Sequence, residues 1–320
     1  MGFYTVEWDE QKYSDLVMRV DEEASKYTRG SLLVIGGSAK FTGAPILSSI
    51  AAAKAGAGYV SVMVPKEIEF VARCHLLSIP VIPAPSRIGM LQPGAVDTAK
   101  KQLNHLDAVV LGPGMGTSLS TAQITAKALR EFDVPVLLDA DGLNVVAGRH
   151  LADQGLTTRR RDDGNDVMDA LVERRDRGAA TVLTPHDGEL KRLSDACIAR
   201  GQEAPEGTDG MPKRVVNAAI VSAHTGAIVV AKGHQTYVVR EGSALKCPVG
   251  TQALAKAGTG DVLSGAIGSF LAQGLPTFGA CALGVRVHAI AGSLAEEKLG
   301  MAGVMAEDVM EAIPSAIMKL

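Results

Sequence analysis

Short runs of β-branched and aliphatic residues alternate along the chain with Ala-rich stretches of helical periodicity. We expect strands at 31–35, 58–64, 77–82, 108–111, 134–138, 181–183, 227–231 and 236–239. We expect helices near 44–56, 93–104, 119–131, 187–200 and 213–224. Several strand segments are apolar throughout, which is typical of strands buried on both faces of a parallel sheet. The alternation of strands and helices therefore predicts a layered α/β fold.

Helical periodicity dominates from Gly260 to Gly300, with one interruption at residues 274–276. Since Gly and Pro break helices, this pattern predicts two consecutive helices that close the fold. No internal repeat or low-complexity linker divides the chain, so we expect one main domain over residues 30–320. Residues 1–29 are expected to form a helical lead-in to that domain.

One segment, residues 157–178, differs from the rest because it contains six Arg and six acidic residues. Its charges cancel, which argues against an arm that binds nucleic acid. We expect a charged insertion that forms a solvated helical excursion or a mobile loop. A lid or a subunit contact is the alternative interpretation.

Composition narrows the class of protein. A hydrophobic content of 47% and a charged content of 21% exclude a largely disordered chain. A net charge of −3 gives no basic surface for nucleic acid, and the four cysteines form no C-x-x-C pair that would suggest zinc. The acidic start does not resemble a signal peptide, and the most apolar long window is too polar to span a bilayer. We therefore expect a soluble, cytoplasmic protein without a membrane partner.

The strongest chemical signal is the sequence Gly258-Thr259-Gly260-Asp261, directly before a helix rich in Ala and Leu. Free N–H groups and the positive dipole end at such a helix start form a hole for a phosphate. Small residues let the backbone approach that phosphate closely. Asp261 in the first turn is placed to take a proton from a hydroxyl that attacks the phosphoryl group. The alternative is an ordinary helix cap.

Five further loops follow predicted strands, and each contains Gly, Pro or polar residues. Their sequences are GGS at 36–38 leading into TGA at 42–44, GPGMG at 112–116, DADGLN at 139–144, TPHDGE at 184–189 and KGHQT at 232–236. Each by itself is compatible with an ordinary turn. Because open α/β sheets bind ligands at the carboxyl ends of their strands, the six loops together predict one active-site edge.

Together these motifs resemble those of the ADP/ATP-dependent NAD(P)H-hydrate dehydratases, a family of the ribokinase-like superfamily. The resemblance runs from about residue 30 to residue 317 and implies a three-layer fold with a central, mostly parallel sheet flanked by helices. The family often carries an N-terminal epimerase domain, for which we see no room here, so the chain resembles the stand-alone dehydratase. Thr251, Lys256 and Asp187 depart from the family pattern, which usually has Pro after the TPH motif.

The resemblance implies repair of NADH or NADPH that has been hydrated at C6 of the nicotinamide ring. ADP or ATP would phosphorylate the C6 hydroxyl, and phosphate would then leave, giving AMP or ADP. Asp261 would be the general base. The hydrated dinucleotide would bind at Ala44, Gly114, Gly116, His186 and Asp261. The adenine nucleotide would bind at Lys232, Gly233, His234, Gln235, Thr236, Gly258, Thr259 and Gly260, the last three forming the phosphate hole.

Phosphoryl transfer also implies Mg²⁺, which offsets the charge between phosphates. Glu189 resembles the acidic position that holds this metal through water in the superfamily. It is equally compatible with a carboxylate that stabilises a helix start, and the same ambiguity keeps Asp139 and Asp141 out of the catalytic set. His186 is also compatible with a solvated loop histidine. The family further implies a homo-oligomer, commonly a tetramer.

Two other functions agree with parts of the sequence. The first is a related kinase that phosphorylates a hydroxymethylpyrimidine or a hydroxyethylthiazole. The TPHDGE and GPGMG loops argue against it, because such kinases more often carry Asn at the position of His186. The second is a regulator that binds nucleotide without turnover, and the intact sequence from Gly258 to Asp261 argues against that.

Overall fold

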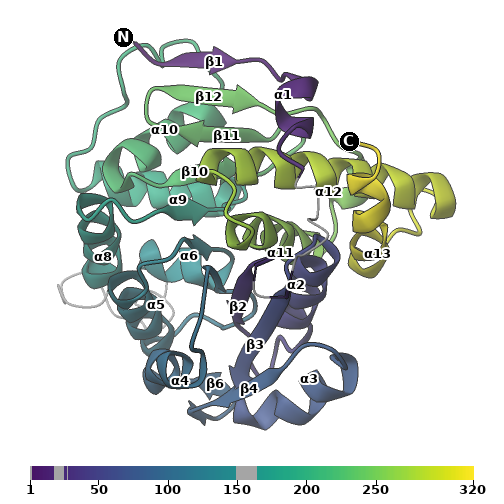
Figure 1. Cartoon of the computed structure of the whole chain (residues 1–320). Helices are drawn as coiled ribbons and strands as arrows, with labels where there is room; N and C mark the ends of the chain where they lie inside the picture. The colour runs from purple at the N-terminus through teal and green to yellow at the C-terminus, as the bar shows by residue number, and fades with distance from the viewer. Residues whose placement is uncertain (1, 18–24, 27, 149–163) are drawn as a thin grey trace.

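The structure is a computed structural model of the 320-residue chain, and it describes residues 2–17, 25, 26, 28–148 and 164–320. Within these residues a ten-stranded sheet has the order β1-β12-β11-β10-β9-β8-β7-β2-β3-β4 (Figure 1). All neighbouring pairs are parallel except those of β11, which runs antiparallel to β10 and β12. The strands are β1 (Tyr4–Val6), β2 (Ser31–Ile35), β3 (Tyr59–Pro65), β4 (Val81–Ala84), β7 (Ala108–Leu111), β8 (Val136–Leu138), β9 (Thr181–Leu183), β10 (Ile228–Ala231), β11 (Tyr237–Arg240) and β12 (Ser243–Lys246). A separate hairpin pairs β5 (Ser86–Arg87) with β6 (Met90–Leu91).

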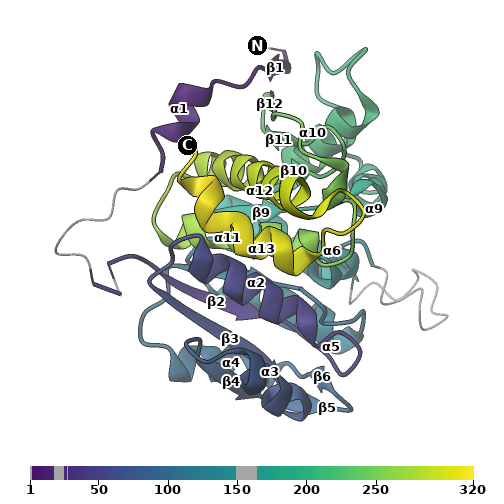
Figure 2. The ribbon, with the colours of Figure 1, turned by 90° about the vertical axis from the view of Figure 1, so that its right-hand side faces the viewer.

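Helices cover both faces of the sheet. One layer, facing the viewer in Figure 2, contains α2 (Gly43–Lys54), α3 (Glu69–His75), α11 (Thr259–Ala272), α12 (Thr277–Leu299) and α13 (Ala306–Ile317). The opposite layer contains α4 (Gly94–Gln102), α5 (Leu119–Glu131), α6 (Asp141–Val146), α8 (Gly164–Asp176), α9 (Asp187–Ile198) and α10 (Lys213–Thr225). The short elements are α1 (Glu10–Ser14), η1 (Lys66–Ile68) and η2 (Gln252–Leu254). The layered α/β prediction is confirmed.

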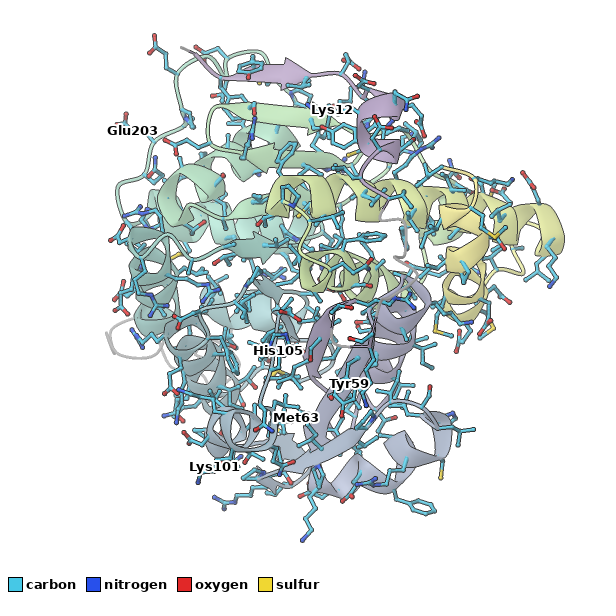
Figure 3. All side chains as sticks on the ribbon, viewed as in Figure 1. Lys12, Tyr59, Met63, Lys101, His105 and Glu203 are labelled. Carbon is cyan, nitrogen blue, oxygen red and sulfur yellow. The ribbon has the colours of Figure 1, made fainter. Side chains whose placement is uncertain are left out.

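The apolar strands are explained by burial on both faces. In β2, Leu32 and Val34 pack into one hydrophobic core while Leu33 and Ile35 pack into the other. Successive side chains of a strand point to opposite faces, so a strand between two helix layers needs apolar residues at every position. Figure 3 shows Met63 inside the fold, while Lys101 lies at its outer surface.

Most predicted elements agree with the structure to within two residues, including the two helices after Gly258. The strand predicted at 77–82 starts later, at Val81, and Leu77 is 96% exposed. The N-terminal segment is not only helical, because β1 pairs with β12 at the edge of the main sheet. Edge pairing of a three-residue strand leaves almost no periodic pattern in the sequence, which is why the prediction missed it.

The charged segment is partly buried, so its interpretation as a solvated excursion is wrong for residues 164–176. Helix α8 packs against α5, and its Val167, Met168, Ala170 and Leu171 are buried. Their spacing places them on one face of the helix, but the surrounding charges masked this stripe in the sequence. Residues 157–163 lie outside the described part of the chain.

Helix α12 is long and apolar enough to cross a membrane by length and composition alone. However, 72% of its most apolar stretch is buried inside the protein. It packs against α11 and α13, and this is the environment of a core helix.

The strand order places a topological switch at β2. From β2 the chain continues through α2 to β3 and then β4, whereas β7 returns to the other side of β2. The loops after β2 and β7 therefore diverge and leave a crevice at the carboxyl ends of the strands. This is where open α/β sheets bind their ligands.

Candidate functional site

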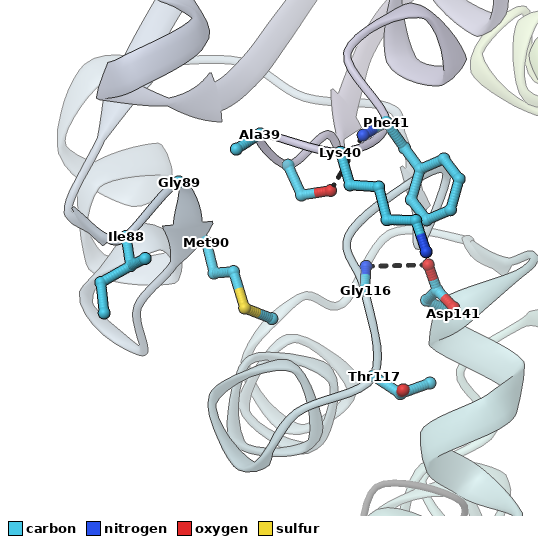
Figure 4. A pocket seen from close by; sticks show the side chains of 10 residues that line it. Ala39, Lys40, Phe41, Ile88, Gly89, Met90, Gly116, Thr117 and Asp141 are labelled. Carbon is cyan, nitrogen blue, oxygen red and sulfur yellow. Dashed lines mark hydrogen bonds between the residues drawn. The ribbon is translucent and has the colours of Figure 1, made fainter. Parts of the chain in front are cut away.

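A cavity of about 560 Å³ opens at this switch point (Figure 4). We call it the switch-point cavity. Its lining is Ser38, Ala39, Lys40, Phe41, Ile88, Gly89, Met90, Gly116, Thr117 and Asp141. The Gly116 N–H donates to Asp141 Oδ2 at 2.8 Å, and the Lys40 ammonium lies 5.1 Å from the centre of the Phe41 ring. The cavity thus combines an aromatic surface with one cation and one carboxylate.

Of the predicted dinucleotide residues, Gly116 lines this cavity, whereas Ala44 and Gly114 do not line it but lie next to each other beside Phe41, which does. A β-carbon at Gly114, whose φ is +67°, would lie 2.9 Å from Phe41 Cβ and 3.1 Å from Ala44 Cβ. A β-carbon at Gly116 would lie 3.3 Å from the Met90 methyl group. The GPGMG loop is therefore glycine-rich because it passes close to the start of α2 and the β5–β6 hairpin.

A second cavity of about 580 Å³ lies at the start of α11, and we call it the helix-start cavity. Of the predicted residues, it is lined by His186, Lys232, Gly233, His234, Thr236, Thr259 and Gly260. Two predicted residues do not line it. The Gln235 amide donates to the carbonyl of Cys247, and Gly258 packs against Leu47 and Ala306. His186 thus lies beside the predicted nucleotide residues rather than with Ala44 and Gly114.

The start of α11 has the form needed to hold an anion. Gly258 is the N-cap with φ +90°, and no side chain caps the helix. The N–H groups of the first turn therefore have no partner within the helix. The Thr259 hydroxyl donates instead to the carbonyls of Leu254 and Lys256, at 2.7 and 2.8 Å, and so fastens the preceding turn.

Charged side chains gather behind this helix start. The Lys232 ammonium lies 2.9 Å from Asp139 Oδ1, and Asp139 is only 2% exposed. Burial opposes the charge of Lys232, but the carboxylates of Asp139, Glu189 and Asp261 outweigh it and raise the pKa of Lys232. Burial, followed by repulsion from Asp139, raises the pKa of Asp261 to about 7. A carboxyl with this pKa can exchange protons near neutral pH.

Asp261 lines neither cavity, although it is close to residues that line each of them. It follows Gly260, which lines the helix-start cavity, and its pKa is also raised by Asp141, which lines the switch-point cavity. Its backbone carbonyl accepts from the Ser48 hydroxyl of α2 at 2.9 Å. The predicted general base therefore lies near both cavities.

The loop after β9 is held by two sets of contacts. The side chains of His186 and Glu189 form a reciprocal cap of α9. In this cap the backbone N–H of His186 donates to Glu189 Oε2 at 2.9 Å. Asp187 pairs with both ends of the Arg214 guanidinium at 2.7 Å, and Arg214 also donates to the carbonyl of Gln235. The departure from the family pattern at Asp187 thus ties the loop after β9 to the loop after β10.

Glu189 caps α9 and also lies near the charged side chains of Lys232 and Asp139. It is 6% exposed, and burial raises its pKa to about 7. Its second oxygen lies 3.3 Å from His186 Nε2. Within the described residues, no three His, Cys, Asp or Glu side chains are grouped as a metal site. Any metal here would therefore need water or a ligand's own oxygens to complete its coordination.

The sequence left Asp139 and Asp141 undecided, and Arg214 was missed. Between the two aspartates, Ala140 has φ +48°, which is rare for a residue with a β-carbon and is a form of strain found at functional sites. The sequence feature that could have identified the two aspartates is the position of DADGLN directly after a buried strand. No sequence feature points to Arg214, because its partner Asp187 is 27 residues away.

Comparison with known proteins agrees with this geometry. The family model of the NAD(P)H-hydrate dehydratases matches residues 32–315. The ADP-dependent (S)-NAD(P)H-hydrate dehydratase of Neisseria meningitidis is 32% identical over 91% of this chain and 86% of its own. The bifunctional NAD(P)H-hydrate repair enzyme of Salinibacter ruber is 33% identical over 92% of this chain and 49% of its own. The chain thus spans about half the length of such bifunctional relatives.

The fold also resembles that of a solved structure. The Bacillus subtilis ADP/ATP-dependent NAD(P)H-hydrate dehydratase, co-crystallised with ATP and Mg²⁺, has a TM-score of 0.73. The alignment covers 98% of this chain and 97% of the other at 24% identity. At that identity the likeness concerns the fold, which is that of the ribokinase-like proteins.

Proposed function

Because the chain belongs to the NAD(P)H-hydrate dehydratase family, we propose that it restores NADH or NADPH from the C6-hydrated forms, with ADP or ATP as phosphoryl donor. The observation that carries this proposal is Asp261, which lies in the first turn of an uncapped helix and close enough to Asp141 of the switch-point cavity for that carboxylate to raise its pKa. Two cavities with a base near both suit a reaction between two bound substrates.

The helix-start cavity would hold the adenine nucleotide. Its transferable phosphate would accept hydrogen bonds from the free N–H groups at Gly260 and Asp261, with the helix dipole favouring its charge. The loop over Lys232, Gly233, His234 and Thr236 would contact the nucleotide, and Gln235 would hold that loop from behind.

The switch-point cavity would hold the hydrated nicotinamide, with Ala44, Gly114 and Gly116 allowing close approach. Asp261 would accept the proton of the C6 hydroxyl as that oxygen forms a bond to phosphorus. The bond between phosphorus and the nucleotide breaks, and the leaving AMP or ADP keeps its electron pair. Phosphate then leaves C6 with the C–O electron pair, and loss of a proton from the neighbouring carbon restores the ring double bond. His186 lines the helix-start cavity and would hydrogen-bond the substrate from there.

Mg²⁺ fits this site as an ion carried by the nucleotide. The carboxylates are hard oxygen ligands, and Mg²⁺ usually binds through one or two of these together with substrate phosphates and water. Glu189 would hold it through water. The ion would supply neutralisation of phosphate charge during transfer.

The direct test is turnover. Given hydrated NADH, Mg²⁺ and either ADP or ATP, the purified protein should restore the absorbance of the reduced nicotinamide. One phosphate and one AMP, or ADP from ATP, should appear per cofactor restored. Recovery without nucleotide cleavage would contradict the kinase-like mechanism. Phosphorylation of a hydroxyethylthiazole or a hydroxymethylpyrimidine in its place would identify a small-alcohol kinase, and nucleotide binding without either reaction would identify a regulator.

Gly260→Val should abolish detectable binding of ADP. A β-carbon at this position would lie 3.3 Å from the Lys232 ammonium, and a branched side chain would also fill the space in front of the helix start. Isothermal titration calorimetry measures the effect. Gly2→Val is a control for binding, because this exposed glycine has no left-handed φ and its β-carbon would make only an ordinary contact, 3.6 Å from the Glu206 carbonyl oxygen. An unchanged dissociation constant in Gly260→Val would mean that the phosphate binds elsewhere.

The pH dependence of turnover should report the raised pKa of Asp261. The base must be ionised to accept a proton, so kcat should rise with pH, pass half of its plateau near pH 7 and decrease about tenfold per pH unit below that. An ordinary exposed aspartate would give a half-point near pH 4. A profile that stays flat from pH 5 to 8 would exclude a single ionised base of this pKa.

We also propose a cytoplasmic homo-oligomer, with a tetramer as the expected form. Phe70, Val71 and Leu77, on and just after α3, are 79%, 40% and 96% exposed. An apolar patch of this kind supports a subunit contact. Light scattering of the purified protein measures the assembly, and a monomer at micromolar concentration would contradict it.

A further inference from the structure

The KGHQT motif alone does not explain the position of the Lys232 ammonium group. Lys232 follows β10, and its backbone N–H donates to the Pro185 carbonyl at 2.9 Å, which fixes the base of the side chain. The side chain is 19% exposed and runs inward to Asp139 at the end of β8. The neighbouring Gly233 instead lies against the Arg214 guanidinium at the surface of the loop.

Lys232 Nζ reaches the start of α11. A β-carbon built on Gly260 would lie 3.3 Å from this nitrogen, so the ammonium is in contact with the first turn of the helix. Gly260 and Lys232 both line the helix-start cavity. A phosphate bound to the N–H groups of that turn would therefore meet the ammonium directly.

We propose that Lys232 is a second catalytic residue that contacts the phosphoryl group in flight between nucleotide and C6 hydroxyl, and that Asp139 is its positioning residue. The inference rests on the proposed function and makes it more specific. During transfer, negative charge spreads over the oxygens of the phosphoryl group while Asp261 accepts the hydroxyl proton. A fixed ammonium stabilises that charge without any solvent reorganisation. Asp139 supplies the fixed position, since its buried oxygen holds the ammonium at 2.9 Å.

The alternative is that Lys232 only binds the nucleoside, as part of the loop that continues to Thr236. The two interpretations differ in which ligand loses affinity. A contact to the transferred phosphoryl group is available to the donor nucleotide and absent from the product nucleotide. A contact to the nucleoside is shared by both.

The experiment is calorimetric titration of Lys232→Met with donor and product, without dinucleotide. Both ADP with AMP and ATP with ADP are measured, because either pair could be donor and product. The variant should bind the donor at least ~10-fold more weakly than wild type, in line with the loss of a charge-assisted contact, and the product within about twofold. In the turnover assay, kcat should decrease at least ~10²-fold, as for other groups that stabilise transferred charge. Lys246→Met, which removes a half-exposed lysine on β12, is the matched control and should match wild type.

Asp139→Asn tests the positioning role. It keeps the lysine but loses the charged partner, so kcat should decrease while the product nucleotide still binds as in wild type. Lys232→Met leaves the buried Asp139 unpaired and is at risk of unfolding. The double variant Lys232→Met/Asp139→Asn removes one charge of each sign and leaves no unpaired Asp139 carboxylate, so the same titration is carried out on it as well.

The possible results distinguish failure of the proposed role of Lys232 from failure of the proposed function of the protein. Equal weakening of donor and product, or a changed KM with unchanged kcat, would assign Lys232 to the nucleoside and overturn the inference. A wild-type protein that binds no adenine nucleotide would overturn the proposed function itself.

Discussion

Asp261→Asn should reduce kcat at least ~10²-fold, the lower end for loss of a general base, and leave the affinity for ADP close to that of wild type. The amide keeps the size and the first-turn position of the carboxyl but cannot accept the hydroxyl proton. Steady-state kinetics with hydrated NADH and calorimetry with ADP measure the two quantities. The matched control is Asp195→Asn, which alters a 57% exposed aspartate on α9. A variant with near-wild-type kcat would remove Asp261 from the catalytic role.

The same substitution should stabilise the protein above neutral pH. The folded pKa of Asp261, about 7, lies above its unfolded value of 3.8, so the fold favours the protonated form. That contribution is fully present below pH 4 and is lost progressively as pH rises to and through 7, above which ionisation in the buried site costs on the order of 4 kcal/mol. Asn never ionises and avoids this cost. We expect a Tm several degrees above wild type at pH 8, and a smaller gain at pH 5.

Arg174→Ala should destabilise the fold by ~3 kcal/mol or more. Arg174 is completely buried in α8, with no carboxylate partner among its hydrogen bonds, and burial lowers its pKa to about 10. Its guanidinium donates to the carbonyls of Leu129, Phe132, Val134 and Ala180, which join the end of α5 to β8 and β9. Alanine would remove a donor from each of these carbonyls and open a cavity beside them, although the Leu129 and Ala180 carbonyls would keep their bonds from Arg177 and the Val136 N–H.

Urea unfolding measures this loss as a lower midpoint at constant slope. Arg73→Ala is the matched control, since its side chain is 54% exposed and pairs with Glu69 at the surface. It should change the free energy of unfolding by no more than about 0.5 kcal/mol. Arg174→Lys should be destabilised as well, because an ammonium has three donors and cannot reach carbonyls spread around a planar fork. Wild-type stability of both Arg174 variants would mean that α8 is not held by this residue.

The difference between Asp261 and Arg174 shows how far the sequence could be interpreted. Asp261 follows two glycines before a helix, and this local spacing already predicts a phosphate hole with a base beside it. Arg174 lies in a segment whose charges cancel, so the pattern indicated solvent exposure. Its function depends on four carbonyls contributed by residues up to 45 positions away, and no local pattern encodes them.

The layered α/β fold, most of its helices and the loops predicted to carry the chemistry can be inferred from the sequence alone, because burial between layers and turn geometry act on residues close in the chain. The tertiary structure was needed to show that the loops form two cavities, that His186 lies with Lys232 rather than with Gly114, and that Asp139 holds the ammonium of Lys232. These features depend on residues that are far apart in the chain. Strand order places Asp139, Lys232 and Asp261 at one edge although they are separated by up to 122 residues, and the raised pKa of Asp261 exists only after burial brings these charges together.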